Sequence, residues 1–208
     1  LMLFHKLRIA DASVRNNQWE REAHRGMELK GKTVALIGFG NMGRSFARKL
    51  SGMECRVVAY DKYVQGYHGD EGVLEWTMDQ VFEQADVVSL HLPLNEETHL
   101  LVRQDWLRAF KRPITLINTA RGGIVNTAHV LDAIDAQEIH GAALDVLEFE
   151  RRSLEGLTSR SSELDRLLAN DRVVLSPHVA GWSVESYFKL SDVLADKIQD
   201  WQHTLLST

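Results

Sequence analysis

Short apolar runs that alternate with helix-like segments constrain this sequence more than any other feature. The runs are rich in Val, Ile and Leu and do not alternate with polar residues, so both faces of each predicted strand are expected to be buried, as in a parallel sheet. They are TVALIG (33–38), CRVVAYD (55–61), DVVSLHL (86–92), ITLIN (114–118), HGAALDV (140–146) and RVVLS (172–176). Helices are expected between them near residues 42–51, 77–84, 104–110 and 126–136. This alternation predicts an α/β fold: a doubly wound parallel sheet with helices on both faces and right-handed crossovers.

The two ends of the chain do not fit a sheet crossover. Residues 2–18, within the terminal segment 1–18, are predicted to form a helix, and residues 183–208 contain a longer one over 183–206, for which Ser183 is the expected N-cap. The apolar face of the first helix is formed by Leu3, Leu7 and Ala10. The polar segment 150–170 predicts a loop with one short helix. We therefore expect a core domain over residues 30–182, with two terminal helices that pack against something outside the sheet.

Composition excludes several classes of protein. The 208 residues include 44% hydrophobic and 25% charged residues, and the formal net charge is −5, which is typical of a soluble globular domain and offers no basic surface for nucleic acid. No apolar run approaches the ~18 residues of a membrane span, and no signal peptide is recognised. Cys55 is the only cysteine, so no internal disulfide can form, and the cytoplasm is the expected compartment. No metal site and no membrane partner are expected.

The stretch VALIGFGNMGRSFARKL (34–50) places three glycines between a strand and a helix. Gly38 allows a tight turn, Gly40 lets the backbone approach a pyrophosphate, and Gly43 lets the helix pack close to the strand. The helix N-terminus then offers N–H groups and a positive dipole end to phosphate. The alternative is a plain strand–helix turn with incidental glycines. The position after a strand and before a helix favours a dinucleotide cradle.

Asp61 ends the second predicted strand, 18 residues after Gly43. This spacing matches the ~20-residue offset of a carboxylate that binds a ribose diol. A carboxylate there repels a 2′-phosphate, so NAD is favoured over NADP, although Lys62 directly after it weakens that preference. The alternative is that Asp61 is a turn residue.

Polar side chains follow three later strands, at the edge of the sheet where ligands bind. Arg121 comes after the fourth run, Glu150 after the fifth and His178 after the sixth. An arginine can hold a carboxylate in a bidentate grip, a histidine can take a hydroxyl proton, and a neighbouring carboxylate orients the histidine and favours its protonated form. Together they can support hydride-transfer chemistry near a nicotinamide.

Each of these side chains also has a structural interpretation. Arg121 could cap a turn, Glu150 could be solvated in a charged loop, and His178 could be an ordinary loop histidine; their convergence at successive strand ends favours a functional site. His91 also lies at a strand end, and we interpret it as a residue near the cofactor rather than a catalyst.

Five motifs in order resemble one family. GKTVALIGFGNMGRSFARKL, VVSLHLPLNEET, LINTARGGIVN, GAALDVLEFE and LSPHVAGW are similar to the nucleotide-binding domain of the D-isomer-specific 2-hydroxyacid dehydrogenases, close to the D-3-phosphoglycerate dehydrogenase group. The resemblance covers nearly the whole chain and implies a Rossmann-type domain, NAD as the cofactor and a 2-hydroxyacid or 2-ketoacid as the substrate.

The resemblance also implies residue roles. Arg121 matches the family's substrate-binding and catalytic arginine, Glu150 its glutamate beside the histidine and His178 its acid/base histidine. Asp145 matches an aspartate that contacts the nicotinamide carboxamide, and Asp61 the ribose-binding one. The expected cofactor-binding residues are Gly38, Gly40, Asn41, Met42, Gly43, Asp61, His91, Pro93, Thr119, Ala120, Arg121, Asp145, His178 and Gly181.

The sequence departs from the family pattern in two places. Arg151 stands where the family usually has proline, and the following loop is long, so Glu148 remains an alternative to Glu150 as the partner of His178. Family members carry a substrate domain of ~100 residues before the nucleotide domain, a typical domain size. That domain is expected to be missing here, with residues 1–18 matching the helix that links the two domains.

The resemblance leaves more than one function open. The leading hypothesis is an NAD-dependent D-2-hydroxyacid dehydrogenase that forms a homodimer. An NAD-sensing module, as in corepressors that resemble this family, can keep the same residues. A third hypothesis is a hydrolase similar to S-adenosylhomocysteine hydrolase, but the motifs NTARGG and SPHVAGW fit it poorly.

Overall fold

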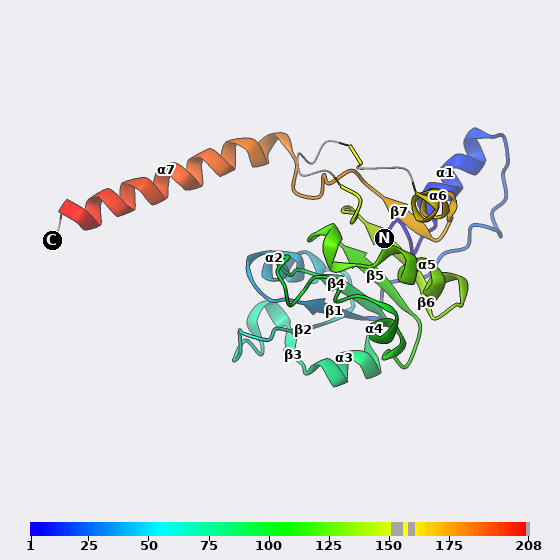
Figure 1. Cartoon of the computed structure of the whole chain (residues 1–208), viewed down its shortest axis with the longest axis horizontal. Helices are drawn as coiled ribbons and strands as arrows, with labels where there is room; N and C mark the ends of the chain where they lie inside the picture. Colours follow the sequence, from blue (N-terminus) through cyan, green and yellow to red (C-terminus); the bar gives the residue numbers. More distant parts are fainter. Residues whose placement is uncertain (151–155, 158–160, 207–208) are drawn as a thin grey trace.

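The computed structural model describes residues 1–150, 156–157 and 161–206, with side chains up to residue 203. Among these residues, seven parallel strands form one sheet in the order β3-β2-β1-β4-β5-β6-β7 (Figure 1). The strands are β1 (Thr33–Ile37), β2 (Arg56–Tyr60), β3 (Leu74–Glu75), β4 (Val87–Leu90), β5 (Ile114–Asn118), β6 (Ile139–Leu144) and β7 (Val173–Leu175). The strand order reverses direction between β1 and β4, which is where ligands bind in such sheets. The predicted doubly wound parallel sheet is confirmed.

Helices connect the strands, and short polar side chains cap several of them. The helices are α1 (Leu7–Arg15), α2 (Asn41–Leu50), α3 (Met78–Gln84), α4 (Gln104–Arg108), α5 (Thr127–Asp135), α6 (Ser162–Ala169) and α7 (Val184–Leu206), with single 3₁₀ turns η1 (Asp70–Gly72) and η2 (Gly122–Ile124). Thr77 and Gln80 form a capping box on α3, and Asn126 caps α5. Ser183 accepts a hydrogen bond from the Ser186 N–H at 3.1 Å, as expected of the N-cap of α7.

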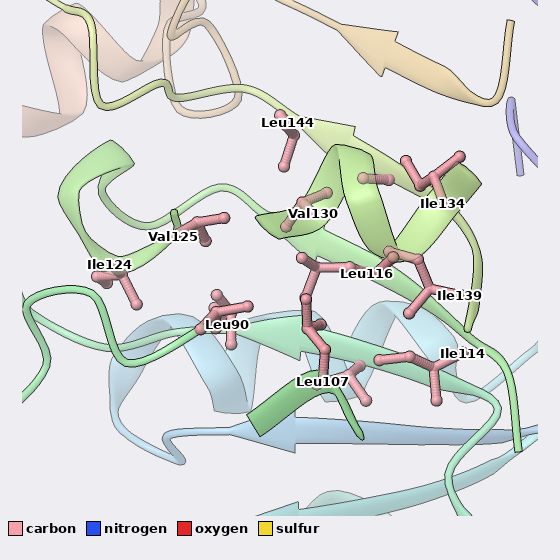
Figure 2. Packing of buried hydrophobic residues seen from close by; sticks show 14 of the residues in the cluster. Leu90, Leu107, Ile114, Leu116, Ile124, Val125, Val130, Ile134, Ile139 and Leu144 are labelled. Atoms are coloured by element: carbon pink, nitrogen blue, oxygen red, sulfur yellow. The ribbon is translucent and has the colours of Figure 1, made fainter. Parts of the chain in front are cut away.

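Both faces of the sheet are covered, which explains why its strands lack polar alternation. Successive residues of β1 point to opposite faces: Ala35 and Ile37 join one cluster, and Val34 and Leu36 join the other. The first cluster packs against α3, α4, α5 and α6, and Figure 2 shows side chains of α4 and α5 against β4, β5 and β6. The second packs against α2 and against Phe4 near the N-terminus. These two apolar layers hold the carboxyl ends of the strands in one row.

Two sequence predictions about elements were wrong in detail. The first helix was expected over residues 2–18, but it begins at Leu7, because Lys6 has a left-handed backbone (φ 50°) and Phe4 turns inward to the core. Within the described residues, the sheet also has a seventh strand, β3, which the sequence did not predict because it is only two residues long. The predicted loop at 150–170 lies partly outside the described residues, and its short helix is α6.

The C-terminal helix α7 extends away from the sheet (Figure 1). Its large apolar side chains are exposed along most of its length. They are Val184, Tyr187, Phe188, Leu190, Val193, Leu194, Ile198 and Trp201. In the part of the chain that the structure describes, no helix combines the length and the apolar character needed to cross a membrane.

Candidate cofactor and active site

The three glycines of the β1–α2 turn meet different surroundings. Gly38 has φ +97°, and a Cβ added there would lie 2.5 Å from the His91 carbonyl oxygen. A Cβ on Gly43 would lie 2.3 Å from the Gly38 carbonyl oxygen, so both glycines are needed for close backbone packing. A Cβ on Gly40, in contrast, would meet no protein atom within 4 Å. The turn thus leaves open space in front of Gly40 and the start of α2, which fits the pyrophosphate of a dinucleotide.

Asp61 lies directly beside this turn and organises it. Its Oδ2 accepts a hydrogen bond from the Phe39 N–H at 2.8 Å, and its Oδ1 accepts from the N–H groups of Tyr63 and Val64 at 2.9 Å each. Partial burial by itself would raise the pKa of Asp61, but these three backbone hydrogen bonds outweigh it and bring the pKa below its ordinary value. Asp61 is therefore ionised near neutral pH. A carboxylate has about four acceptor positions, so Asp61 can accept one more hydrogen bond, from a ribose hydroxyl.

A cavity of about 440 Å³ opens between the glycine turn, Asp61 and the loop after β4. Its lining includes the expected site residues Gly38, Gly40, Asp61, His91 and Pro93. The rest of its wall is largely apolar and includes Met78, Phe82, Leu101 and Trp106. A largely apolar cavity with a few polar groups, Asp61 among them, suits the adenosine end of a dinucleotide.

The loop after β5 carries Arg121, and the side chain of Asn118 holds the backbone of this loop by two hydrogen bonds. The Asn118 side chain is fully buried; its Oδ1 accepts from the Ala120 N–H, and its Nδ2 donates to the Arg121 carbonyl oxygen, both at 3.0 Å. One Arg121 guanidinium nitrogen donates to the Ala120 carbonyl oxygen at 2.6 Å. A Cβ on Gly122 would lie 2.0 Å from the Leu147 carbonyl oxygen, so this glycine lets the Arg121 loop touch the loop after β6.

Glu150, rather than Glu148, lies against His178. The Glu150 Oε2 is 2.8 Å from the His178 Nδ1, and its other oxygen accepts from the Leu147 N–H. Glu148 accepts instead from the Thr127 N–H at 2.8 Å, at the start of α5. The side chains of His178 and Glu150 are only 24% and 18% exposed, so the pair is partly shielded from water. Because Glu150 faces Nδ1, it leaves Nε2 as the nitrogen that can exchange a proton with a ligand.

Asp145, at the end of β6, holds the His178 loop. Its carboxylate accepts from the Ser176 hydroxyl and from the N–H groups of Val179 and Ala180, each of the latter at 2.9 Å. Its carbonyl oxygen accepts from the His178 N–H at 2.7 Å. His178 itself has a left-handed backbone, with φ 57°. Such conformations persist where surrounding contacts over-determine them, and here Asp145 supplies those contacts.

A second cavity, of about 620 Å³, brings most of the expected site residues together. It is lined by Met42, His91, Pro93, Thr119, Ala120, Arg121, Asp145, His178 and Gly181, among others. Pro93 and His91 also line the cavity beside Asp61, so the two cavities adjoin along the carboxyl edge of the sheet. Asn41 begins α2, Gly43 is buried within it, and Glu150 lines a smaller cavity next to His178. Arg121 and His178 therefore face one space.

His91 differs from His178 in its electrostatics. Its ring packs on Phe46 at a centroid distance of 5.3 Å, and its Nε2 is buried without a hydrogen-bond partner among the described residues. Burial lowers the pKa of His91 to about 4. His91 is thus neutral near pH 7, which disfavours it as a general acid.

The sequence did not single out Asn118 or the apolar wall beside Asp61. The available signal for Asn118 was an asparagine as the last residue of a mostly apolar strand, where a polar group that becomes buried needs hydrogen-bond partners. The apolar wall comes from α3, α4 and the loop after β4, and only the folded chain shows that they meet.

The chain is similar in sequence to known dehydrogenases. Residues 1–180 match the family described as D-isomer specific 2-hydroxyacid dehydrogenase, NAD binding domain. The chain is 34% identical over 194 residues to the D-3-phosphoglycerate dehydrogenase of Archaeoglobus fulgidus, with 93% of this chain and 35% of that protein covered. It is 32% identical over 190 residues to the hydroxypyruvate reductase of Thermotoga maritima, with coverage of 91% and 59%.

Solved structures of similar dehydrogenases share the fold of this chain. A D-isomer specific 2-hydroxyacid dehydrogenase from Lactobacillus delbrueckii ssp. bulgaricus, in an NAD-complexed form, is 29% identical, with a TM-score of 0.79 over 95% of this chain and 64% of that one. The D-lactate dehydrogenase with NAD+ from Lactobacillus jensenii is 28% identical, with a TM-score of 0.78 over 89% and 57%. The chain thus spans 35% and 59% of the length of the two sequence relatives given above.

Proposed function

Because the chain belongs to the D-isomer specific 2-hydroxyacid dehydrogenase family, whose NAD-binding domain residues 1–180 match, we propose that it acts as an NAD-dependent oxidoreductase on a D-2-hydroxyacid and its 2-ketoacid. One observation supports this most: His178 pairs with Glu150 at 2.8 Å and shares a cavity with Arg121. An acid/base group and a carboxylate-binding group thus face the same space, which adjoins the glycine cradle.

The residues of the cradle are proposed to hold NAD. Gly40 and the start of α2 would face the pyrophosphate, and Asp61 would accept from the adenosine ribose. When bound, NAD supplies the acceptor for the hydride that leaves C2 of the hydroxyacid, and its reduced form supplies the donor in the opposite direction. Asp61 is ionised, so it disfavours a 2′-phosphate, and NAD is the proposed cofactor rather than NADP.

His178 is the proposed acid/base residue. In oxidation, the C2 hydroxyl must lose its proton as the hydride leaves, or an unstable protonated ketone forms. With Nδ1 facing Glu150, the His178 Nε2 takes this proton, and in reduction the protonated imidazole returns it. Glu150 orients the ring through its contact with Nδ1 at 2.8 Å.

Arg121 is the proposed substrate-binding residue. One of its nitrogens is held by the Ala120 carbonyl oxygen, and the guanidinium has further N–H groups that can grip the substrate carboxylate and polarise the C2 carbonyl. The Asn118 side chain fixes the backbone on both sides of this arginine, so its position is set before substrate arrives.

Assays of the full-length gene product with NADH and a panel of small 2-ketoacids test the proposal. Oxidation of NADH with at least one ketoacid is the expected result. Tight NADH binding without turnover of any ketoacid would instead favour an NAD-sensing module. The cytoplasm and a homodimer remain predictions, and the dimer would pair two copies of this domain about a two-fold axis.

A further inference from the structure

Three side chains form a bridge across the mouth of the cavity beside Asp61. The Lys62 Nζ pairs with Oε1 of Glu97, and the Tyr63 hydroxyl donates to Oε2 of the same glutamate at 2.5 Å. Lys62 and Tyr63 follow β2, whereas Glu97 belongs to the loop after β4, so the bridge joins segments on either side of β1. All three residues line the same cavity as Asp61 and Gly40.

Asp61 sets the position of the bridge. Its Oδ1 accepts from the N–H groups of Tyr63 and Val64, which closes a tight turn directly after β2. This turn directs Lys62 and Tyr63 toward Glu97. The proposed ribose-binding carboxylate, Asp61, and the lysine that lines this cavity, Lys62, are therefore neighbours in one short segment.

Among the described residues that line this cavity, the one lysine is paired with a carboxylate beside the proposed ribose position. Asp61 and Glu97 carry two negative charges, and Lys62 carries one positive charge. Glu97 has a lowered pKa, chiefly through its hydrogen bond from Lys62, and the pKa of Lys62 is raised by the same bond. Lys62 lies next to Asp61, where the extra phosphate of a 2′-phosphorylated dinucleotide would be placed. It would be the natural partner of that phosphate if it were not already paired.

We propose that Glu97 is a specificity-determining residue that excludes 2′-phosphorylated dinucleotides by holding Lys62 across the cavity mouth. The exclusion then has two parts: Asp61 repels the 2′-phosphate, and Glu97 removes the lysine that would otherwise compensate. This inference rests on the dinucleotide site proposed above and adds a residue from a different loop.

Calorimetric titration of the chain with NADH and with NADPH tests the proposal. Glu97→Gln keeps the shape of the side chain and frees Lys62, so affinity for NADPH should rise about threefold to fivefold while affinity for NADH stays nearly constant, as expected for one charge pair near the surface. In the double variant Glu97→Gln/Lys62→Met this gain should disappear. The gain should also shrink at high ionic strength.

A matched control separates the bridge from net charge. Glu96→Gln removes the same charge from the neighbouring residue and leaves the Lys62–Glu97 pair intact, so it should change the NADPH-to-NADH affinity ratio less than twofold. An equal gain in Glu96→Gln, or a gain that persists without Lys62, would show that Glu97 acts only through charge and would overturn the inference. Failure of the unaltered chain to bind NADH would instead contradict the cofactor site itself, and the inference with it.

Discussion

At the scale of single residues, His178 combines a strained backbone with a fixed side chain. Its φ of 57° is unusual for a residue with a Cβ, and four hydrogen bonds from residues 176–180 to Asp145 hold the loop in this form. Glu150 then fixes the ring at Nδ1. The backbone and the ring of His178 are thus both held in place, and His178 lines the cavity that Arg121 also lines.

Replacing His178 by alanine should remove the proposed acid/base group and leave the cradle intact. We expect turnover of the full-length gene product to fall about 10²–10⁴-fold, the usual range for such a loss. Affinity for NADH should change little. Steady-state kinetics and calorimetry measure the two effects separately. Turnover near that of the unaltered protein at every pH would show that His178 is not the acid/base residue.

Arg121→Ala serves as the comparison variant. Because Arg121 is proposed to bind the substrate carboxylate as well as to polarise the carbonyl, it should raise KM and lower kcat together. A change confined to kcat would assign carboxylate binding to another residue.

His91 should make the protein sensitive to moderate acid. Its pKa is lowered to about 4 by burial, whereas the unfolded chain titrates near the ordinary histidine value. As pH falls from about 6.5 toward 4, the unfolded state binds a proton that the folded state does not, so stability is lost. At about pH 5 this term amounts to about 2 kcal/mol. Urea unfolding at about pH 7.5 and about pH 5 should therefore show a smaller acid loss in His91→Leu; an equal loss in both proteins would contradict the prediction.

At the scale of elements, the strands were predictable because each is a short apolar run with both faces buried. The edge strand β3 was not, since Leu74 and Glu75 are half-buried and too few to form a pattern. The start of α1 was misplaced for a different reason: helical periodicity over residues 2–18 does not reveal that Phe4 is drawn into the core. Local pattern fixes what an element is, and tertiary packing fixes where it ends.

The sequence predicted part of the candidate site, as it predicted part of the fold. The rule that ligands bind beyond the strand ends located Arg121 and His178, and the structure places both on one cavity. The choice between Glu148 and Glu150 was not accessible from the sequence. The two differ by two positions in one loop, and only the fold shows that one caps α5 and the other faces His178.

The β1–α2 turn allows a test that separates folding from binding. Gly43→Ala places a Cβ 2.3 Å from a backbone oxygen and should destabilise the protein, whereas Gly40→Ala meets no protein atom within 4 Å and should leave stability nearly unchanged. If a pyrophosphate lies in front of Gly40, the alanine there should still weaken NADH binding. Thermal unfolding and calorimetry give the two readouts. Unchanged NADH affinity in Gly40→Ala would contradict the cradle.

At the scale of the whole molecule, apolar surface is concentrated at the two ends of the described chain. Leu7 and Val14 are exposed on α1, Trp19 is 84% exposed just after it, and α7 carries a longer apolar row. Exposed apolar groups of this extent usually mark contact surfaces. We expect two copies of the domain to pair in an isologous dimer. Analytical ultracentrifugation should show a dimer at micromolar concentration, and a monomer there would contradict this prediction.

Residues 1–208 expressed alone should bind NADH yet reduce 2-ketoacids slowly or not at all. The cradle, Asp61 and the cavity beside it lie wholly within the described residues, so we expect these residues to bind the dinucleotide on their own. The cavity shared by Arg121 and His178 is different: Arg121 is exposed, and the relatives that the chain matches are longer proteins, of which it spans 35% and 59%. Closing an active site expels water and completes the set of groups around the substrate, so an open cavity should support little turnover. Calorimetry measures the binding and NADH absorbance the turnover; turnover equal to that of the full-length gene product would show that these residues form the complete substrate site.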